Sequence, residues 1–388
     1  MIGFKKEIEK LKVGSRGSRL ALAQVEEVFC LLSQQGFKVE YENVVFDTRG
    51  DKDKQTSLLE NPADNFFTDT IDRALLNGGI DIAVHSAKDL PQSFPEGLKI
   101  LALTAPLDET DAFVGKTDFA DLPSGSRVGT SSLLRRESIK RLNPLVEPVD
   151  IRGTIEERLA LLEQNVYDGL IVATCALKRL GLEGKIKNIM PWPATPLQGQ
   201  LAVVGRREAA ARLSRVFSAI DARRTYGCVT LVGAGPGDPE LITLKGIRAL
   251  EKADCVFYDY LVDQRLLEHA PRAEKIYAGK RKGEHSLAQT ELSRMLREKA
   301  CSGKNVVRLK GGDPLVFGRG ADELEYLRAY HIEVKIVPGI TSATGLPSVL
   351  GIPLTARGVS SSVAFLSGHR EGERSASDEL LEIGRAHV

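Results

Sequence analysis

Two glycine-rich runs in the second half of the chain have the residue types of ligand-binding loops. The first reads Val232-Gly233-Ala234-Gly235-Pro236-Gly237-Asp238, and the second reads Arg308-Leu309-Lys310-Gly311-Gly312-Asp313-Pro314. Each run follows a short apolar segment of strand type, at 228–233 and 305–309. Glycine lets the backbone turn sharply and approach a bound molecule closely. The two runs therefore predict a binding site at strand-to-helix turns.

A nicotinamide-dependent dehydrogenase is one alternative, because dinucleotide-binding folds also start with a strand and a glycine-rich turn. Asp259 ends the next predicted strand, about where an acidic residue contacts the ribose in such folds. Two observations count against this class. The spacing is GxGxG with Pro236 inside it, not GxGxxG, and a dinucleotide fold has no need of the second loop at Gly311 and Gly312.

Composition narrows the possible partners. The chain has 388 residues, with 53 basic and 52 acidic side chains, so no global field favours nucleic acid or an anionic membrane. An acidic ligand must then be met by local arginine and lysine clusters. The five cysteines lack metal-ligand spacing, which predicts no metal site and fits a reducing, cytoplasmic compartment. We find no signal peptide and no apolar run long enough to span a membrane.

Alternating strand-like and helix-like segments must position these loops. In the first half, strands are predicted at 11–13, 39–46, 80–85 and 98–103, and helices at 18–35, 68–77, 155–164 and 205–224. In the second half, the order is strand 228–233, helix 243–252, strand 255–258 and strand 305–309. This alternation predicts an α/β protein with parallel sheets covered by helices, and a main boundary near Arg224.

The second half resembles the uroporphyrinogen-III C-methyltransferases of the tetrapyrrole methylase superfamily, over about 227–369. The ordered runs that carry the resemblance are 232–239, 258–259, 279–281, 285–286, 307–320, 337–343 and 351–355. The resemblance implies two α/β domains with S-adenosyl-L-methionine held between them. It also implies a product, precorrin-2, that leads to sirohaem or cobalamin, and a possible homodimer through the methylase domain.

The same resemblance assigns roles to individual residues of this chain. The residues that match methyl-donor contacts are Pro236, Gly311, Gly312, Asp313, Val316, Thr341 and Ser342. Asp259 matches the proton acceptor, and Lys280 matches the proton donor. A carboxylate that removes a pyrrole N–H proton would make the adjacent ring carbon a better nucleophile toward the methyl group.

The first half resembles hydroxymethylbilane synthase, also called porphobilinogen deaminase, over about 11–215. The runs that carry this resemblance are 15–22, 48–51, 81–91, 111–113, 128–136, 152–153 and 177–182. The resemblance implies the first two domains of that family, which are similar to a type II periplasmic binding protein with a cleft between them. Its substrate, porphobilinogen, carries acetate and propionate groups.

Residues in matching or nearby positions would line that cleft. Those expected to contact the substrate are Arg16, Ser18, Lys88, Ser132, Arg135, Arg136, Arg152 and Arg158. Arginine pairs carboxylates through two parallel hydrogen bonds. Asp89 matches the catalytic acid, which protonates the departing amine and stabilises the cation that follows. The arginine pair follows Ser-Ser-Leu-Leu instead of Ser-Ser-Leu, which leaves its register open.

The expected domains are 1–224, 225–370 and a tail at 371–388. The first comprises two subdomains, 11–105 with 195–215 and 106–194.

We expect the deaminase family's third domain to be absent, together with the cysteine that binds its dipyrromethane cofactor. The sequence around Cys228 resembles the site of that cysteine only weakly. Residues 382–388 match a translated sequencing adapter, so we expect a truncated, non-native tail. The second methylase domain, beyond a connecting strand at 362–368, would be missing, and methyl-donor binding would be weak.

Two alternatives stay open at this stage. The first half could be a non-catalytic pyrrole-binding scaffold instead of an enzyme that makes hydroxymethylbilane. The second half could act on a later corrinoid precursor instead of uroporphyrinogen III. The runs 311–320 and 351–355 favour the uroporphyrinogen enzyme.

Overall fold

The computed structural model describes residues 10–52, 68–91, 94–279 and 289–366. The chain divides into two compact units, Met1–Arg224 and Thr225–Val388. Each unit is described by itself. The tail expected at 371–388 lies outside the described residues.

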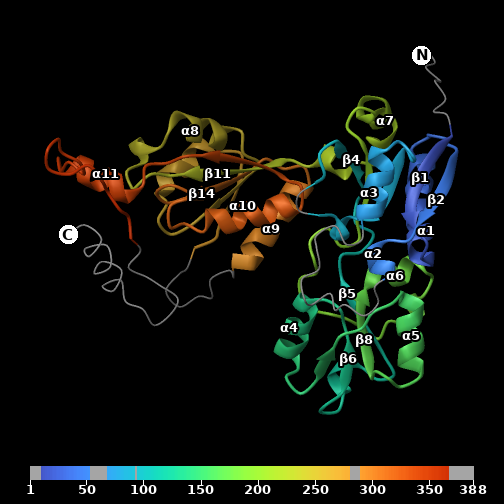
Figure 1. Ribbon diagram of the computed structural model, residues 1–388. Coiled ribbons are helices and arrows are strands. Elements are labelled where there is room, and N and C mark those ends of the chain that lie inside the picture. The colour runs from blue at the N-terminus through green and yellow to red at the C-terminus, as the bar shows by residue number, and fades with distance from the viewer. Residues whose placement is uncertain (1–9, 53–67, 92–93, 280–288, 367–388) are drawn as a thin grey trace. The chain divides into compact units, whose positions relative to one another are not determined.

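The first unit contains two five-stranded sheets, each covered by helices (Figure 1). The first sheet has the order β2-β1-β3-β10-β4. Its strands are β1 (Leu11–Arg16), β2 (Tyr41–Phe46), β3 (Ile82–Ser86), β4 (Leu98–Leu103) and β10 (Leu201–Arg206). The helices around it are α1 (Arg19–Gln34), α2 (Arg49–Lys52), α3 (Asp69–Leu76) and α7 (Ala210–Phe217). One core packs α1 and α7 against the sheet, and a second packs α3.

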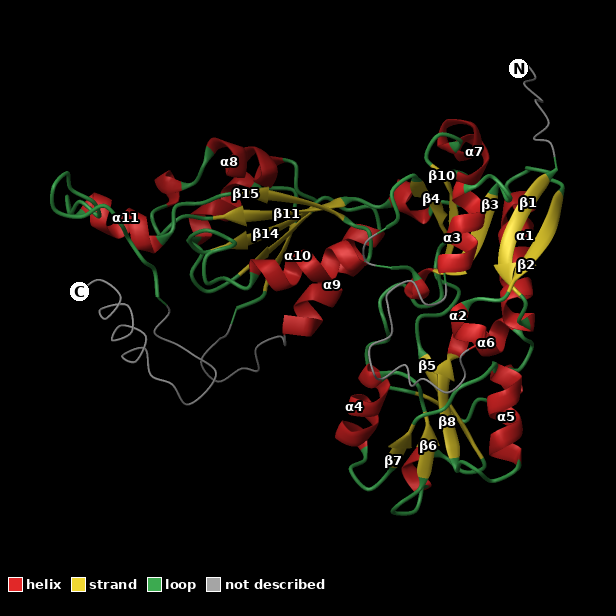
Figure 2. Cartoon of the chain, in the orientation of Figure 1, coloured by secondary structure: helices red, strands yellow, loops and turns green. Residues whose placement is uncertain are grey.

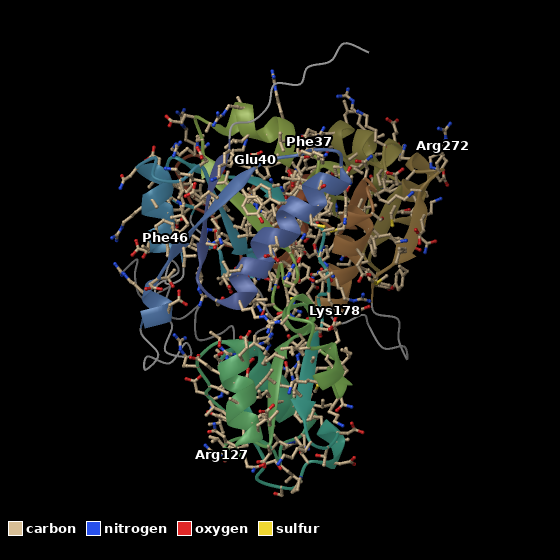
Figure 3. All side chains as sticks on the ribbon, turned by 90° about the vertical axis from the view of Figure 1, so that its right-hand side faces the viewer. Phe37, Glu40, Phe46, Arg127, Lys178 and Arg272 are labelled. Carbon is tan, nitrogen blue, oxygen red and sulfur yellow. The ribbon has the colours of Figure 1, made fainter. Side chains whose placement is uncertain are left out.

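The second sheet of this unit has the order β7-β6-β8-β5-β9. Its strands are β5 (Asp111–Gly115), β6 (Arg127–Gly129), β7 (Glu147–Val149), β8 (Gly169–Ala173) and β9 (Asn188–Ile189). Its helices are α4 (Leu133–Leu142), α5 (Ile155–Glu163) and α6 (Thr174–Arg179). The chain crosses between the sheets after β4 and again before β10. Each sheet of the first unit, with its helices, forms one lobe. Lys178 and Arg127 lie at opposite ends of the second lobe (Figure 3).

The second unit is built on one all-parallel sheet of order β13-β12-β14-β11-β15 (Figure 2). The strands are β11 (Cys228–Gly233), β12 (Cys255–Tyr258), β13 (Glu274–Tyr277), β14 (Val306–Lys310) and β15 (Glu333–Val337). The helices are α8 (Leu244–Glu251), α9 (Gln289–Cys301), α10 (Gly320–Ala329) and α11 (Ser342–Val349). Because all strands are parallel, the loops that follow them gather at one edge of the sheet.

Short 3₁₀ helices complete the described elements. They are η2 (Ala87–Asp89), η3 (Phe119–Asp121), η4 (Glu183–Lys185), η5 (Ala222–Thr225), η6 (Pro239–Leu241) and η7 (Gln264–His269).

Most predicted elements are confirmed. The strands at 98–103, 228–233 and 255–258 have the predicted bounds. Three predicted helix starts carry a side-chain hydroxyl at the cap position, and in α1 and α8 the hydroxyls of Ser18 and Thr243 accept a hydrogen bond from the first turn.

Three expectations were wrong. The predicted helix at 205–224 starts only at Ala210, because Gly205 and Arg206 belong to β10, which pairs with β3 and β4. Parallel pairing holds for the second unit, but in the first unit β10 and β5 run antiparallel to their partners. The connecting strand expected at 362–368 is not formed by residues 362–366, which have no partner strand among the described residues, and 367–368 lie outside them.

Candidate functional site

The two glycine-rich loops of the second unit are joined by backbone hydrogen bonds. Gly235 and Gly312 form an isolated antiparallel bridge, in which Gly312 N donates to Gly235 O at 2.7 Å and Gly235 N donates to Gly312 O at 3.2 Å. Both residues have positive φ, 82° and 67°, which glycine adopts without strain. The loops after β11 and β14 therefore form one structure.

A third loop, after β15, joins these two through the carboxylate of Asp313. Its Oδ1 accepts from Leu315 N at 2.9 Å, and its Oδ2 accepts from Gly339 N at 3.0 Å. Gly339 approaches β11 so closely that a Cβ on Gly233 would lie 2.5 Å from the Gly339 Cα. Asp313 thus joins the loops after β14 and β15, and the Gly235–Gly312 bridge adds the loop after β11 at the same carboxyl edge of the sheet.

The other predicted methyl-donor residues lie on the same loops. Thr341 caps α11, with its hydroxyl accepting from Ala343 N at 3.4 Å, and Ser342 is the first residue of that helix. Pro236 packs near Gly345 of α11, where an added Cβ would lie 3.0 Å from the proline ring. Val316 donates its N–H to Asp313 O at 3.3 Å, in the loop that starts with Gly311. One edge of the sheet therefore carries the whole predicted set.

Asp259 follows β12 at this edge. Its Oδ1 accepts from Leu261 N at 3.2 Å, and its Oδ2 accepts from Arg308 Nη2 at 3.3 Å. A hollow of about 260 Å³ adjoins it. The residues lining that hollow are Tyr258, Asp259, Tyr260, Val262, Gln264 and Tyr277. Lys280, the matched proton donor, lies outside the described residues.

A cluster of buried charged side chains next to Asp259 was not predicted from the sequence. Glu323 of α10, fully buried, accepts from Lys310 Nζ at 3.2 Å and from Arg308 Nε at 3.3 Å. Burial and the neighbouring Arg308 lower the pKa of Lys310. The sequence does contain a signal: Arg308 and Lys310 are two residues apart in a strand, so their side chains share one face of an otherwise apolar segment.

In the first unit, Arg16 and Ser18 lie where β1 leads into α1. The Arg16 guanidinium pairs with the Asp51 carboxylate, which also accepts from Thr48 Oγ1 at 2.7 Å. Burial opposes ionisation of Asp51, but Arg16 and Thr48 lower the pKa of its carboxyl overall. The Ser18 hydroxyl accepts from Ala21 N at 3.2 Å and so begins α1.

Lys88 and Asp89 form the short η2 helix directly after β3. Lys88 Nζ donates to Gln198 Oε1 at 3.0 Å. Burial and the neighbouring Arg135 lower the pKa of Lys88. Asp89 is half-buried, and its carboxylate has no hydrogen-bond or ion-pair partner among the residues that the structure describes.

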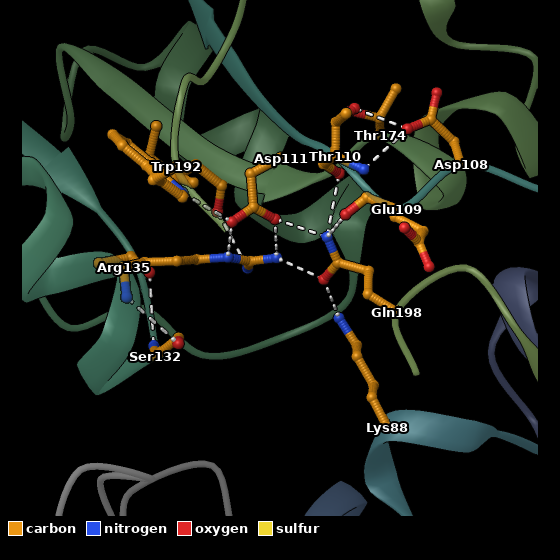
Figure 4. Close-up of polar contacts among 12 residues, drawn as sticks. Lys88, Asp108, Glu109, Thr110, Asp111, Ser132, Arg135, Thr174, Trp192 and Gln198 are labelled. Atoms are coloured by element: carbon orange, nitrogen blue, oxygen red, sulfur yellow. Dashed lines mark hydrogen bonds and ion pairs between the residues drawn. The ribbon is translucent and has the colours of Figure 1, made fainter. Parts of the chain in front are cut away.

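The arginine pair after Ser132 is divided between two environments. Ser132 caps α4, and its hydroxyl accepts from Arg135 N at 3.5 Å. Arg135 is buried, with Nη2 at 2.6 Å and Nε at 3.0 Å from the two carboxylate oxygens of Asp111 (Figure 4). Arg136 is half-buried and donates to Pro148 O at 3.1 Å. The structure thus places Arg135 in an internal ion pair.

Arg152 and Arg158 flank the start of α5. Arg152 Nη2 donates to Gly50 O at 3.3 Å, which links the second sheet's lobe to the first. Arg158 Nε donates to Gly153 O at 2.9 Å. Burial, followed by the charges of Arg135 and Arg152, lowers the pKa of Arg158 to about 10, and Arg16 adds to this effect. Arg16, Arg135 and Arg152, which come from both lobes, therefore share one electrostatic neighbourhood with Arg158.

A hollow of about 370 Å³ beside α5 shares Arg152 with this neighbourhood. Its remaining lining residues are Gly153, Glu157, Ala160, Leu161 and Gln164. In the described ranges no group of His, Cys, Asp and Glu side chains could hold a metal ion. No helix within those ranges is both long and apolar enough to cross a membrane.

Family models match both units. Residues 11–214 match "Porphobilinogen deaminase, dipyromethane cofactor binding domain", and residues 228–386 match "Tetrapyrrole (Corrin/Porphyrin) Methylases". The chain therefore belongs to the porphobilinogen deaminase family through its first unit, and its second unit carries a tetrapyrrole methylase domain.

Several curated proteins are similar to this chain. A uroporphyrinogen-III C-methyltransferase from Methanocaldococcus jannaschii is 54% identical over 38% of this chain and 62% of its own length. An S-adenosyl-L-methionine-dependent uroporphyrinogen III methyltransferase from Arabidopsis thaliana is 48% identical over 40% and 45%. A siroheme synthase from Ectopseudomonas mendocina is 47% identical over 58% and 52%. The match thus spans roughly half the length of these relatives.

Proposed function

We propose that the second unit transfers methyl groups from S-adenosyl-L-methionine to carbon atoms of uroporphyrinogen III, forming precorrin-2 by way of precorrin-1. One observation carries the proposal: the Gly235–Gly312 bridge unites two glycine-rich loops, and Gly311 of the second loop lies against Leu261, two residues after Asp259. The relatives from Methanocaldococcus jannaschii and Arabidopsis thaliana, whose names state this activity, support it.

The loops fit a methyl donor in their backbone chemistry. Gly237 has φ 129°, and a Cβ there would meet no atom within 4 Å, so the loop leaves open space beside its backbone. We propose that backbone groups of Pro236, Gly311 and Gly312 and the polar side chains of Thr341 and Ser342 hold the donor. Val316 would pack against it, and Asp313 would keep the loops after β14 and β15 in place. The bound donor supplies an electrophilic methyl group that carries its own leaving group.

Asp259 is the proposed proton acceptor for a pyrrole N–H. Its carboxylate lines a hollow where a substrate ring can reach it, and Leu261, two residues further on, lies against Gly311. Arg308 Nη2 donates to Oδ2 of this carboxylate at 3.3 Å and so orients it toward the hollow. Lys280 is the proposed proton donor.

Product mass tests the methyl transfer. The intact chain is incubated with uroporphyrinogen III and S-adenosyl-L-methionine, and products are followed by mass spectrometry. Addition of one and then two methyl groups supports the proposal. Methylation only of a later corrinoid precursor would favour the alternative within the same superfamily and would overturn this substrate.

For the first unit, we propose binding of porphobilinogen and its conversion toward hydroxymethylbilane. The supporting observation is the shared field of Arg16, Arg135, Arg152 and Arg158, which suits a pyrrole bearing carboxylates. Asp89, unpaired among the described residues, is the proposed acid that protonates the departing amine. The second candidate is a pyrrole-binding scaffold without turnover.

Ammonia release separates these two candidates. The intact chain is incubated with porphobilinogen, and ammonia and bilane are measured together with binding by calorimetry. Release of both products supports an enzyme. Saturable binding without ammonia supports the scaffold, and absence of binding overturns both. An enzyme and a scaffold are both compatible with our proposal that the whole chain acts in tetrapyrrole biosynthesis, in which the product of the second unit leads to sirohaem or cobalamin.

A further inference from the structure

The side-chain amide of Gln198 lies at the centre of a buried polar network in the first unit (Figure 4). Gln198 is 1% exposed. Its Nε2 donates to Asp111 Oδ1 at 2.8 Å, to Thr110 O at 2.9 Å and to Glu109 O at 3.1 Å. Its Oε1 accepts from Lys88 Nζ at 3.0 Å and from Arg135 Nη2 at 3.1 Å. Both ends of the amide are therefore fully used.

These partners determine which way the amide faces. The nitrogen meets only acceptors and the oxygen meets only cations, so a reversed amide would lose every one of these bonds. A glutamate at this position would point one carboxylate oxygen at Asp111 and at two carbonyl oxygens. The site therefore requires a neutral group with one donor end and one acceptor end.

Arg135 has little left to offer a ligand. Its Nε and Nη2 bind the two oxygens of Asp111, and Nη2 also binds Gln198. Its Nη1 lies 3.5 Å from Ile171 O, and the side chain is 9% exposed. Trp192 Nε1 donates to Asp111 Oδ2 at 3.0 Å and so fixes the carboxylate from another side. The edge with which arginine binds a carboxylate bidentately is thus already occupied.

Lys88, by contrast, uses one of its three N–H donors on Gln198. It belongs to η2, directly before Asp89, and lies at one end of the network. We propose that Gln198 is a positioning residue that holds the Lys88 ammonium for a ligand carboxylate, and that Arg135 acts only through Asp111 and Gln198. This inference rests on the proposed binding of porphobilinogen by the first unit, and it reassigns Arg135 from ligand contact to support.

The electrostatic surroundings agree with this arrangement. Arg135 and Lys88 are both cations bound to the same amide oxygen. The Asp111 carboxylate, whose pKa is lowered by Arg135 against the opposing effect of burial, balances the arginine charge. Within the described residues Lys88 forms no ion pair, and its ammonium, on which the charges of Asp89 and Asp111 also act, is the cation left for an acidic ligand.

Competitive acetylation of the intact chain tests the position of Lys88 without any ligand. In Gln198→Leu, we expect Lys88 to react about tenfold faster than in the wild type, because it loses its hydrogen-bond acceptor. The matched control is Gln200→Leu: Gln200 is also buried and donates to Thr104 O at 2.8 Å. That variant should leave the Lys88 rate unchanged. Equal rates in the wild type and Gln198→Leu overturn the inference.

A double-mutant cycle on porphobilinogen affinity then tests the role of the network. Gln198→Leu and Arg135→Gln should each weaken binding by about tenfold, and neither should weaken it further in a Lys88→Met background. Full loss of affinity on Arg135→Gln in that background would mean direct contact with the ligand and would overturn the reassignment. If the wild type binds no porphobilinogen, the proposed function of this unit fails, while the acetylation result still decides whether Gln198 holds Lys88.

Discussion

At the scale of single residues, the Asp259 carboxylate is held by two different donors, a backbone N–H and the guanidinium of Arg308. We predict that Asp259→Asn lowers the rate of methyl transfer to uroporphyrinogen III by about 100-fold or more, because the amide cannot accept the pyrrole proton. Initial rates of product formation measure this loss. Asp263→Asn is the matched control, since Asp263 caps η7 in the same segment. A wild-type rate in Asp259→Asn would remove Asp259 from the chemistry.

Asp72 of α3 is a buried carboxyl close to a second buried carboxyl, that of Asp69. Burial, with a smaller effect from Asp69, raises its pKa from 3.8 to about 6. Because the folded-state pKa lies above the ordinary value, the free energy of unfolding falls as the pH rises from about 4 through 6. We predict that Asp72→Asn stabilises the protein by about 2 kcal/mol near pH 7.5, and by nothing near pH 4.

Urea unfolding at both pH values measures this effect. Asp69→Asn is the contrasting variant, because Asp69 pairs with Arg49 at 2.9 Å and with Arg73 at 2.8 Å. It should destabilise near neutral pH. A destabilised Asp72→Asn near pH 7.5 would contradict the prediction.

His85 of β3 makes the opposite contribution. Burial, followed by the charge of Arg16, lowers its pKa from 6.5 to about 4. The folded state therefore loses stability as the pH falls from about 6.5 to 4, because only the unfolded chain readily takes up the proton. We predict that His85→Gln removes about 2 kcal/mol of this pH dependence, measured as unfolding free energy at a series of pH values. An unchanged slope would refute it.

At the scale of elements, α10 and β14 are joined by Glu323, which is fully buried between Arg308 and Lys310. We predict that Glu323→Gln lowers the unfolding free energy of the second unit by about 3–5 kcal/mol, because it leaves the buried Lys310 without its counter-ion and Arg308 with Asp259 alone. Denaturant unfolding followed by far-ultraviolet circular dichroism measures it. Glu325→Gln, on the exposed side of the same helix, should change stability by less than about 0.5 kcal/mol.

Element boundaries show where sequence patterns succeed and where they fail. The strand at 98–103 and the caps at Ser18 and Thr243 were predictable because their signals are local: apolar runs and hydroxyl residues before helices. The helix predicted at 205–224 failed at its start because Gly205 and Arg206 pair with strands about a hundred residues away in sequence. Pairing across such distances leaves no local trace in the sequence.

At the scale of the whole molecule, each unit has its own cores. Those of the first unit are built from its own residues within 11–217, and the second unit packs around residues 232–337. We predict that residues 1–224 expressed alone unfold cooperatively, with a midpoint within about 2 °C of the matching transition in the intact chain. Differential scanning calorimetry tests this. A non-cooperative transition in the isolated unit would mean that its stability depends on the second unit.

By itself, the amino-acid sequence determined the α/β class, the two modules and the glycine-rich loops, because these depend on residue types and spacings within short segments. Only the tertiary structure decided that Arg135 is committed to Asp111 and Gln198, and that Arg308 serves both Asp259 and Glu323. In each case the partner comes from a distant segment. A charged side chain carries no mark in the sequence that says which opposite charge will be buried beside it, so its availability to a ligand depends on the fold.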